Sequence, residues 1–192
     1  MNHISIEGMD GVGKSTTCKL LAEKLGYIFV EKPLHYLLDD MDNEFVQYQK
    51  VAKRVNANPN RNFTAWYYGL NNIYLYEKFK DQNIVTDRHV VSNYCWSGTT
   101  YNKDIYNLIL KKIGKPKLTV ILYATPQVIL ARLKKRDIND SDITKVSKSE
   151  KAYEKMIYFC ETNKLEYIVI DTTNKDVETV VNEILKTLER LK

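Results

Sequence analysis

Two apolar patterns alternate along the chain. Short apolar runs are typical of buried strands. They predict a first strand that ends around Ile4 and Ile6, and further strands at 27–30, 83–87, 118–123 and 167–170. Longer stretches with apolar residues every three or four positions predict amphipathic helices, at 15–25, 44–55, 63–79, 104–113, 125–136, 147–160 and 177–191. Strands that alternate with helices predict an α/β fold, with a five-stranded parallel sheet covered by helices on both faces. Because no internal repeat or linker interrupts the pattern, residues 1–192 are predicted to form one domain.

Local signals refine several helix ends. Gly26 follows the last apolar residue of the first helix, as a C-cap glycine does. Thr125 followed by Pro126 predicts an N-cap and a first-turn proline. Ser147 and Glu150 have the spacing of a capping box. The polar segment between these last two helices is poor in apolar residues, and it predicts a short mobile lid around 136–147.

A glycine-rich loop joins the first strand to the first helix. Gly8, Gly13, Lys14 and Ser15 satisfy the pattern G-x-x-x-x-G-K-[ST]. Glycines allow successive backbone N–H groups to turn toward a phosphate, and the helix N-terminus adds partial positive charge. The loop therefore predicts a P-loop NTPase fold that binds ATP and Mg²⁺, although an ordinary glycine turn before a helix is the alternative. The predicted nucleotide-binding residues are Gly8, Asp10, Gly11, Val12, Gly13, Lys14, Ser15 and Thr16.

Composition restricts the partners. The net charge is +5, from 29 Lys+Arg against 24 Asp+Glu, and the basic residues are dispersed, which argues against nucleic acid as a partner. No apolar run approaches the roughly 18 residues that cross a bilayer, so no membrane association is expected. The chain enters its first strand within a few residues, leaving no room for a signal peptide. Three cysteines without paired spacing suit a reducing compartment, so a cytoplasmic location is expected.

A second polar group follows the third predicted strand. Asp87 ends that strand, and in a parallel sheet the carboxyl ends of the strands form the ligand-binding edge. A carboxylate there is suited to complete a Mg²⁺ site begun by Ser15. Arg88 presents a planar fork of donors that suits a phosphate. A structural ion pair between Asp87 and Arg88 is the alternative.

Several of these residues together resemble the thymidylate kinase family of nucleoside monophosphate kinases. The resemblance rests on the run from Glu7 to Thr16, on the Asp87–His89 triplet, on Ser92 and Trp96, and on the basic stretch containing Arg132 and Arg136. It implies transfer of the γ-phosphoryl group of ATP to a deoxynucleoside 5′-monophosphate, with dTMP as the default acceptor. It also implies a homodimer.

The resemblance implies roles for single residues. Arg88 would hold the α-phosphate of the acceptor. Asp10 would face the 3′-hydroxyl of the sugar, although a solvent-facing loop residue is the alternative. Trp96 stands where the family has an aromatic ring beside the sugar, and a core tryptophan is the other interpretation.

The basic stretch before the predicted lid is the next candidate. Arg132, Lys135 and Arg136 lie at i, i+3 and i+4 and so share a helix face. Cations carried by a closing lid would neutralise charge on the transferred phosphoryl group, which makes Arg132 and Arg136 candidate catalytic residues alongside Lys14, Asp87 and Arg88. A solvated basic helix end is the alternative.

Departures from the family concern the base and the acceptor. The stretch 63–79 contains no arginine, although the family uses one there to bind thymine, so Tyr67, Tyr68, Asn71 and Asn72 become the candidate base-binding residues. Because Asn71 and Asn72 are adjacent, only one is expected to face the cleft. Glu31 ends the second strand and is a further candidate substrate-binding residue. In a deoxynucleoside kinase, the nearest rival, Glu31 would act as the base on a 5′-hydroxyl; a regulator that hydrolyses nucleotide slowly is a third possibility.

Overall fold

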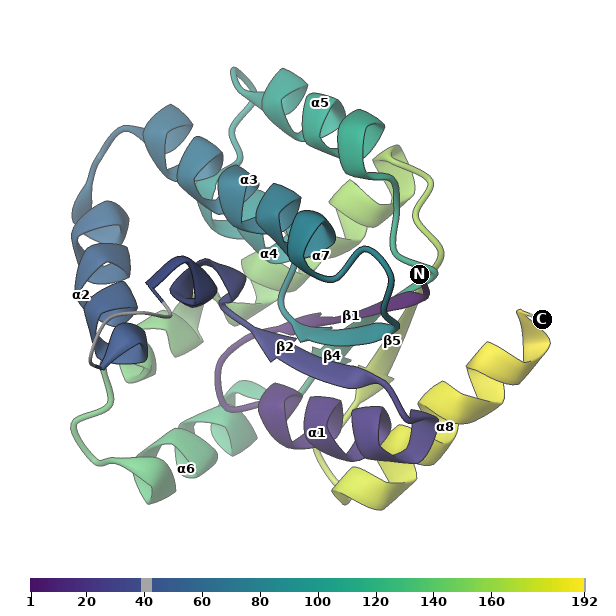
Figure 1. Cartoon of the computed structure of the whole chain (residues 1–192). Coiled ribbons are helices and arrows are strands. Elements are labelled where there is room, and N and C mark those ends of the chain that lie inside the picture. The colour runs from purple at the N-terminus through teal and green to yellow at the C-terminus, as the bar shows by residue number, and fades with distance from the viewer. Residues whose placement is uncertain (39–42, 192) are drawn as a thin grey trace.

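The computed structural model describes residues 1–38 and 43–191. Five parallel strands form one sheet, as predicted, and Figure 1 shows the sheet at the centre of the molecule. The order of the strands is β2-β3-β1-β4-β5. The strands are β1 (His3–Gly8), β2 (Ile28–Glu31), β3 (Ile84–Asp87), β4 (Leu118–Tyr123) and β5 (Tyr167–Asp171).

Helices cover both faces of this sheet. On one face lie α1 (Lys14–Leu25) and α8 (Val177–Arg190). On the other lie α3 (Arg61–Lys78), α4 (Val90–Ser97), α5 (Lys103–Ile113) and α7 (Ser149–Thr162) (Figure 1). The remaining elements lie beside the carboxyl edge of the sheet: the 3₁₀ helix η1 (Pro33–Leu38), α2 (Glu44–Ala57), α6 (Pro126–Arg136) and the 3₁₀ helix η2 (Ser141–Lys148). Within the described residues, none of the helices is both long and apolar enough to cross a bilayer.

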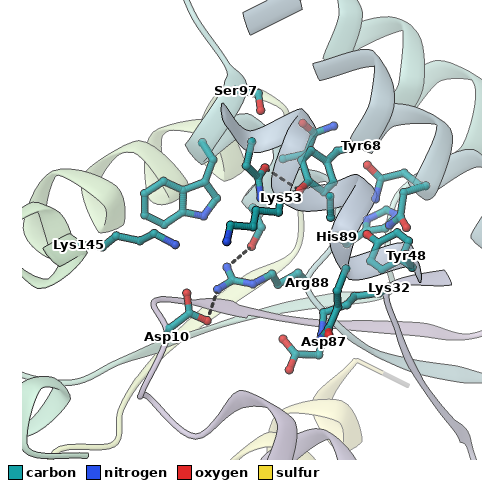
Figure 2. Close-up of a pocket in the computed structure, with 18 of the residues that line it drawn as sticks. Asp10, Lys32, Tyr48, Lys53, Tyr68, Asp87, Arg88, His89, Ser97 and Lys145 are labelled. Atoms are coloured by element: carbon teal, nitrogen blue, oxygen red, sulfur yellow. Dashed lines mark hydrogen bonds and ion pairs between the residues drawn. The ribbon is translucent and has the colours of Figure 1, made fainter. Parts of the chain in front are cut away.

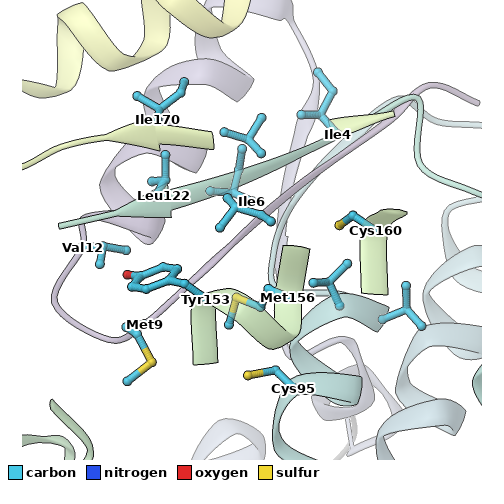
Figure 3. Close-up of a cluster of buried hydrophobic side chains, with 14 of the residues drawn as sticks. Ile4, Ile6, Met9, Val12, Cys95, Leu122, Tyr153, Met156, Cys160 and Ile170 are labelled. Carbon is cyan, nitrogen blue, oxygen red and sulfur yellow. The ribbon is translucent and has the colours of Figure 1, made fainter. Parts of the chain in front are cut away.

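The core fixes the position of the two central strands. Every residue of β1 is buried, and β4 is buried except at its last residue, because helices pack on both faces. Figure 3 shows Ile4 and Ile6 of β1 beside Leu122 of β4 and Ile170 of β5. His3, Ser5 and Glu7 are the polar exceptions in β1, and they are 2%, 0% and 0% exposed.

Two local predictions were wrong. No helix was predicted directly after Asp87, but this segment forms the two-turn helix α4. Ser147 does not cap α7, because η2 runs directly into that helix and the Ser149 N–H already donates to the Val146 carbonyl. The predicted proline start of α6 is present, but Thr125 makes no side-chain cap.

Candidate active site

The loop between β1 and α1 forms the phosphate cradle. Gly8 has a φ of 136°, and a Cβ there would lie 2.4 Å from the Leu122 carbonyl oxygen, so the loop requires glycine at this point. Lys14 is 6% exposed, and its Nζ donates to the Met9 carbonyl at 2.8 Å. Burial and the nearby Arg88 cation lower the pKa of Lys14, whereas Asp10 and Asp87 act in the opposite direction. The ammonium group is therefore fixed inside the loop.

Ser15 and Asp87 meet at the mouth of this cradle. The Ser15 hydroxyl donates to Asp87 Oδ2 at 2.5 Å, because the carboxyl end of β3 lies directly beside β1. One hydroxyl and one carboxylate oxygen fit Mg²⁺, which is usually held by one or two protein oxygens together with phosphates and water. In the described part of the chain no group of three or more His, Cys, Asp or Glu side chains forms a metal cage.

Arg88 is held in one orientation by three partners. Its Nη2 donates to Asp10 Oδ1 at 2.6 Å, and its Nη1 donates to the Gly8 carbonyl at 3.1 Å and to Ser92 Oγ at 3.2 Å (Figure 2). The Arg88 and Lys14 cations keep the pKa of the Asp10 carboxyl well below its usual range. Asp10 is thus paired with Arg88 rather than directed into solvent, while it still lines the large cavity beside the cradle.

This cavity has a volume of about 720 Å³. Its floor contains Asp10, Asp87 and Arg88 from the ends of β1 and β3, and α2, α3, α4 and η2 supply its walls (Figure 2). Trp96 lines the cavity, as the sequence predicted for a ring beside the substrate, and it is partly buried. The cavity is therefore positioned to bring an acceptor molecule to the phosphate cradle.

Four cations of this cavity were missed by the sequence analysis: Lys32, Lys53, Arg61 and Lys145. Lys53 lies on α2, and the only signal for it was that Tyr48, Ala52 and Asn56 share a helix face beside it. Lys145 comes from η2, and its Nζ lies 5.8 Å from the centroid of the Trp96 ring. In Figure 2 Lys53 and Lys145 extend into the space above Arg88.

The far wall of the cavity carries amides and aromatic rings. Asn71 and Asn72 both line it, so the expectation that only one faces the cleft was wrong. Asn71 Oδ1 accepts from the Leu34 N–H at 3.2 Å, and Asn72 is 2% exposed, with no hydrogen-bond partner for its Oδ1 among the described residues. Two adjacent residues can both reach the cavity because η1 packs against this side of α3.

Tyr67 does not line the cavity, in contrast to the sequence prediction. Its hydroxyl is hydrogen-bonded to that of Tyr48, and its ring packs edge-on against Tyr68 at 5.2 Å. Tyr68 takes the cavity position instead, and its hydroxyl donates to Asn56 Oδ1 at 2.7 Å. The helical phase of α3 therefore directs the second tyrosine of the pair, not the first, at the substrate space.

The remaining predicted residues lie outside this cavity. Glu31 pairs in register with Asp87, but its carboxylate lies 3.7 Å from Lys32 Nζ and does not line the cavity. The Arg136 Nε donates to Asp140 Oδ2 at 2.7 Å, and this guanidinium also pairs with Asp142. The expectation that Arg136 and Arg132 point together at a phosphoryl group is thus not met, because acids of the lid segment hold Arg136.

Arg132 lies on the other side of the phosphate cradle. Its Nη2 donates to the Thr172 carbonyl at 2.7 Å, and its Nη1 reaches the Gly11 carbonyl at 3.5 Å. It lines a second cavity of about 180 Å³ together with Gly13, Thr16 and Lys175. This smaller cavity opens beside the N-terminus of α1, so the cradle lies between two spaces.

Two buried histidines pack together at the large cavity, and His89 is one of its lining residues. His89 is 3% exposed, lies 4.6 Å from the ring of His3, and has no hydrogen-bond partner for either ring nitrogen among the described residues. Burial lowers the pKa of His89 to about 3. The imidazole is therefore neutral at physiological pH.

Comparison with known proteins agrees with this geometry. The sequence profile of the family described as "Thymidylate kinase" matches residues 6–184. A protein of Methanocaldococcus jannaschii, described as "Probable thymidylate kinase", is 26% identical over 98% of this chain and 96% of its own length.

Two solved structures share the fold. Thymidylate kinase from Candida albicans superposes with a TM-score of 0.71 at 17% identity, covering 98% of this chain and 91% of that chain. Deoxyadenosine kinase from M. mycoides with bound dCTP superposes with a TM-score of 0.63 at 22% identity, covering 98% of this chain and 99% of that chain. The sheet, the phosphate cradle and the family match over most of the chain lead to one assignment: the protein belongs to the thymidylate kinase family of nucleoside monophosphate kinases.

Proposed function

We propose that this kinase transfers the γ-phosphoryl group of ATP to a deoxynucleoside 5′-monophosphate, with dTMP as the default acceptor. The observation that carries the proposal is the orientation of Arg88. Three hydrogen bonds hold its guanidinium at the floor of the large cavity, next to the cradle that would hold the donor phosphates. A planar, fixed guanidinium is suited to bind a phosphate through two parallel hydrogen bonds.

On the donor side, the backbone N–H groups of the cradle and the N-terminus of α1 would hold the phosphates of ATP, and Lys14 would contact the β- and γ-phosphates. Ser15 and Asp87 would hold Mg²⁺, which supplies charge neutralisation for the phosphates when bound. Arg132 would act indirectly, by fixing the Gly11 carbonyl and the loop around Thr172 beside the smaller cavity.

On the acceptor side, charge favours a phosphorylated substrate. Five cationic side chains but only two carboxylates are found among the described residues that line the large cavity; the cations are Lys32, Lys53, Arg61, Arg88 and Lys145. Glu31 and Asp142, outside the lining, pair with Lys32 and Lys145, but the lining itself still carries more cations than carboxylates. A monophosphate suits such a lining better than an uncharged nucleoside does. The ring of Trp96 would pack beside the sugar, and Tyr68, Asn71 and Asn72 would contact the base.

The rival proposal is a deoxynucleoside kinase, and the structural likeness to deoxyadenosine kinase is the observation that favours it. That reaction needs a carboxylate base at the 5′-hydroxyl. Glu31 would have to serve, yet its carboxylate lies beside Lys32 and outside the large cavity. The monophosphate reaction needs no such base, because the attacking phosphate oxygen is already ionised.

The test is ADP formation from ATP and Mg²⁺ with each deoxynucleoside and each monophosphate as acceptor. We expect turnover with monophosphates, a raised KM and lowered kcat for the acceptor in Arg88→Ala, and little change in Glu31→Ala. Phosphorylation of thymidine itself, abolished in Glu31→Ala, would establish the rival.

We also propose that the protein is a homodimer, and the surface of α3 supports this. Four large apolar side chains on this helix are 39–51% exposed: Phe63, Trp66, Leu70 and Ile73. They recur at helical spacing and so form one exposed stripe, which is typical of an interaction surface. Light scattering should give twice the chain mass, and a monomer at micromolar concentration would contradict the proposal.

A further inference from the structure

Glu7 is a buried carboxylate that the proposed chemistry leaves unused. It lies on β1, one residue before the cradle, and is 0% exposed. It accepts from the Ser5 hydroxyl at 2.6 Å through Oε1, and from the Ser92 N–H at 3.1 Å through Oε2. The Ser92 hydroxyl also donates to Oε2. Burial of an ionisable side chain is costly, so three donors directed at one carboxylate need an explanation.

Ser92 links Glu7 to Arg88. A serine hydroxyl has one proton to donate and lone pairs to accept with. Because Glu7 takes that proton, the lone pairs of Ser92 Oγ remain for Arg88, whose Nη1 donates to them at 3.2 Å. Without the carboxylate the hydroxyl is free to rotate and point its proton at the guanidinium, which would place one donor against another.

Glu7 also fixes the backbone that carries Arg88. Arg88 has a φ of 75°, a left-handed conformation that is uncommon for a residue with a side chain. Helix α4 begins two residues later without a side-chain cap at His89. Glu7 supplies the missing acceptor, since it binds the N–H of Ser92 in the first turn, where a negative charge is favoured.

We propose that Glu7 is a positioning residue, which acts through Ser92 to keep the Arg88 guanidinium directed at the acceptor phosphate. That Arg88 binds the acceptor phosphate rests on the proposed function, whereas the contacts that hold its guanidinium do not depend on it. A carboxylate is required because both of its oxygens face donors. A glutamine would turn an NH₂ group toward either Ser5 or Ser92 and disturb the hydrogen bonds that link Glu7 through Ser92 to Arg88.

The kinetic test compares Glu7→Gln with Glu23→Gln, a matched loss of an exposed carboxylate on α1. We expect Glu7→Gln to raise the KM for the acceptor monophosphate about tenfold while the KM for ATP changes less than about twofold, because the variant disturbs the hydrogen bonds that orient Arg88 and leaves the ATP contacts in place. Ser92→Ala should produce the same split. In an Arg88→Ala background, Glu7→Gln should add nothing to the acceptor KM.

A second measurement does not depend on the activity. In protein labelled with ¹⁵N-arginine, the side-chain N–H signal of Arg88 is assigned by its loss in Arg88→Lys. We expect this signal to shift and broaden in Glu7→Gln and in Ser92→Ala, but to stay unchanged in Glu23→Gln. An unchanged Arg88 signal in both Glu7→Gln and Ser92→Ala would overturn the inference, as would equal changes in the KM values for the acceptor and for ATP. If the wild-type protein phosphorylates no monophosphate but the Arg88 signal shifts as expected in the variants, only the proposed function is overturned.

Discussion

Acidification from pH 7 to pH 5 should lower the free energy of unfolding through the buried histidines. His3 and His89 are 2% and 3% exposed, and their rings pack edge-on between β1 and α3. His3 is hydrogen-bonded to the Tyr76 hydroxyl at 2.7 Å and to the Thr86 hydroxyl at 2.8 Å. Burial lowers the pKa of both imidazoles, and the neighbouring His89 lowers that of His3 further. Protonation of either side chain is therefore less favourable in the folded protein than in the unfolded chain.

The size of the effect follows from the difference in pKa between the two states. The pKa of His89 is 6.5 in the unfolded chain and about 3 in the folded protein. Between these two pH values the unfolded chain binds a proton at His89 and the folded protein does not. The stability from His89 is therefore complete above about pH 6.5 and falls by about 1.4 kcal/mol for each further pH unit until the folded pKa is reached. At pH 5 the loss from His89 is about 2 kcal/mol, which is large beside a typical stability of about 5–15 kcal/mol. The lowered pKa of His3 acts in the same direction.

Urea unfolding at pH 7 and pH 5 measures this loss, with His89→Gln as the comparison. We expect wild type to lose about 2 kcal/mol more than His89→Gln over this interval, because the variant lacks one titrating core group. Titrating groups that His89 does not affect cancel in the difference: burial raises the pKa of Glu7, which acts in the opposite direction, but Glu7 is present in both proteins. His3 does not cancel, because His89 lowers its pKa in wild type only, and this adds to the difference in the same direction. The same pH dependence in the two proteins would refute the reasoning.

Two further predictions concern the site. Lys14→Ala removes the cation inside the cradle, so we expect turnover to fall by orders of magnitude while the urea midpoint changes little; near-native turnover would contradict the assignment of the cradle. The amides of Asn71 and Asn72 offer both donors and acceptors, so we expect at least one deoxynucleotide besides dTMP to be used within about tenfold in kcat/KM, a gap of about 1.4 kcal/mol. Strict dTMP use that survives Asn71→Ala and Asn72→Ala would show that another group binds the base.

The fold was largely predictable because its signals are local. Each strand is a short apolar run, and parallel pairing then places the ends of β1 and β3 side by side, so Ser15 and Asp87 could be assigned to one site from their positions alone. Helix α4 was missed for the opposite reason. Its first turn is stabilised by Glu7, 85 residues earlier in the chain, and no residue next to the helix signals its start.

The walls of the large cavity were less predictable, because they depend on how distant elements pack. Lys145 was part of the predicted lid, but nothing in the sequence distinguished it from Arg136. Asp142 accepts from Lys145 at 2.7 Å and also pairs with Arg136, so the fold of η2 decides which cation reaches the cavity. In the same way, the sequence could not show which of Tyr67 and Tyr68 lines the cavity, because that depends on how α3 is rotated about its axis against the neighbouring elements.

Charge balance explains why the cradle contains acids as well as cations. Lys14 and Arg88 lie close enough for each to disfavour the other's charge, and burial increases that cost. Asp10 pairs with both, Asp87 attracts both, and Glu7 attracts Arg88 from behind the loop, so the cations stay ionised. A polyphosphate that enters this cradle meets cations whose charge is already compensated. Additional positive charge is therefore needed to hold it, and the pair of Ser15 and Asp87 oxygens at the mouth is suited to bind the divalent cation that supplies this charge.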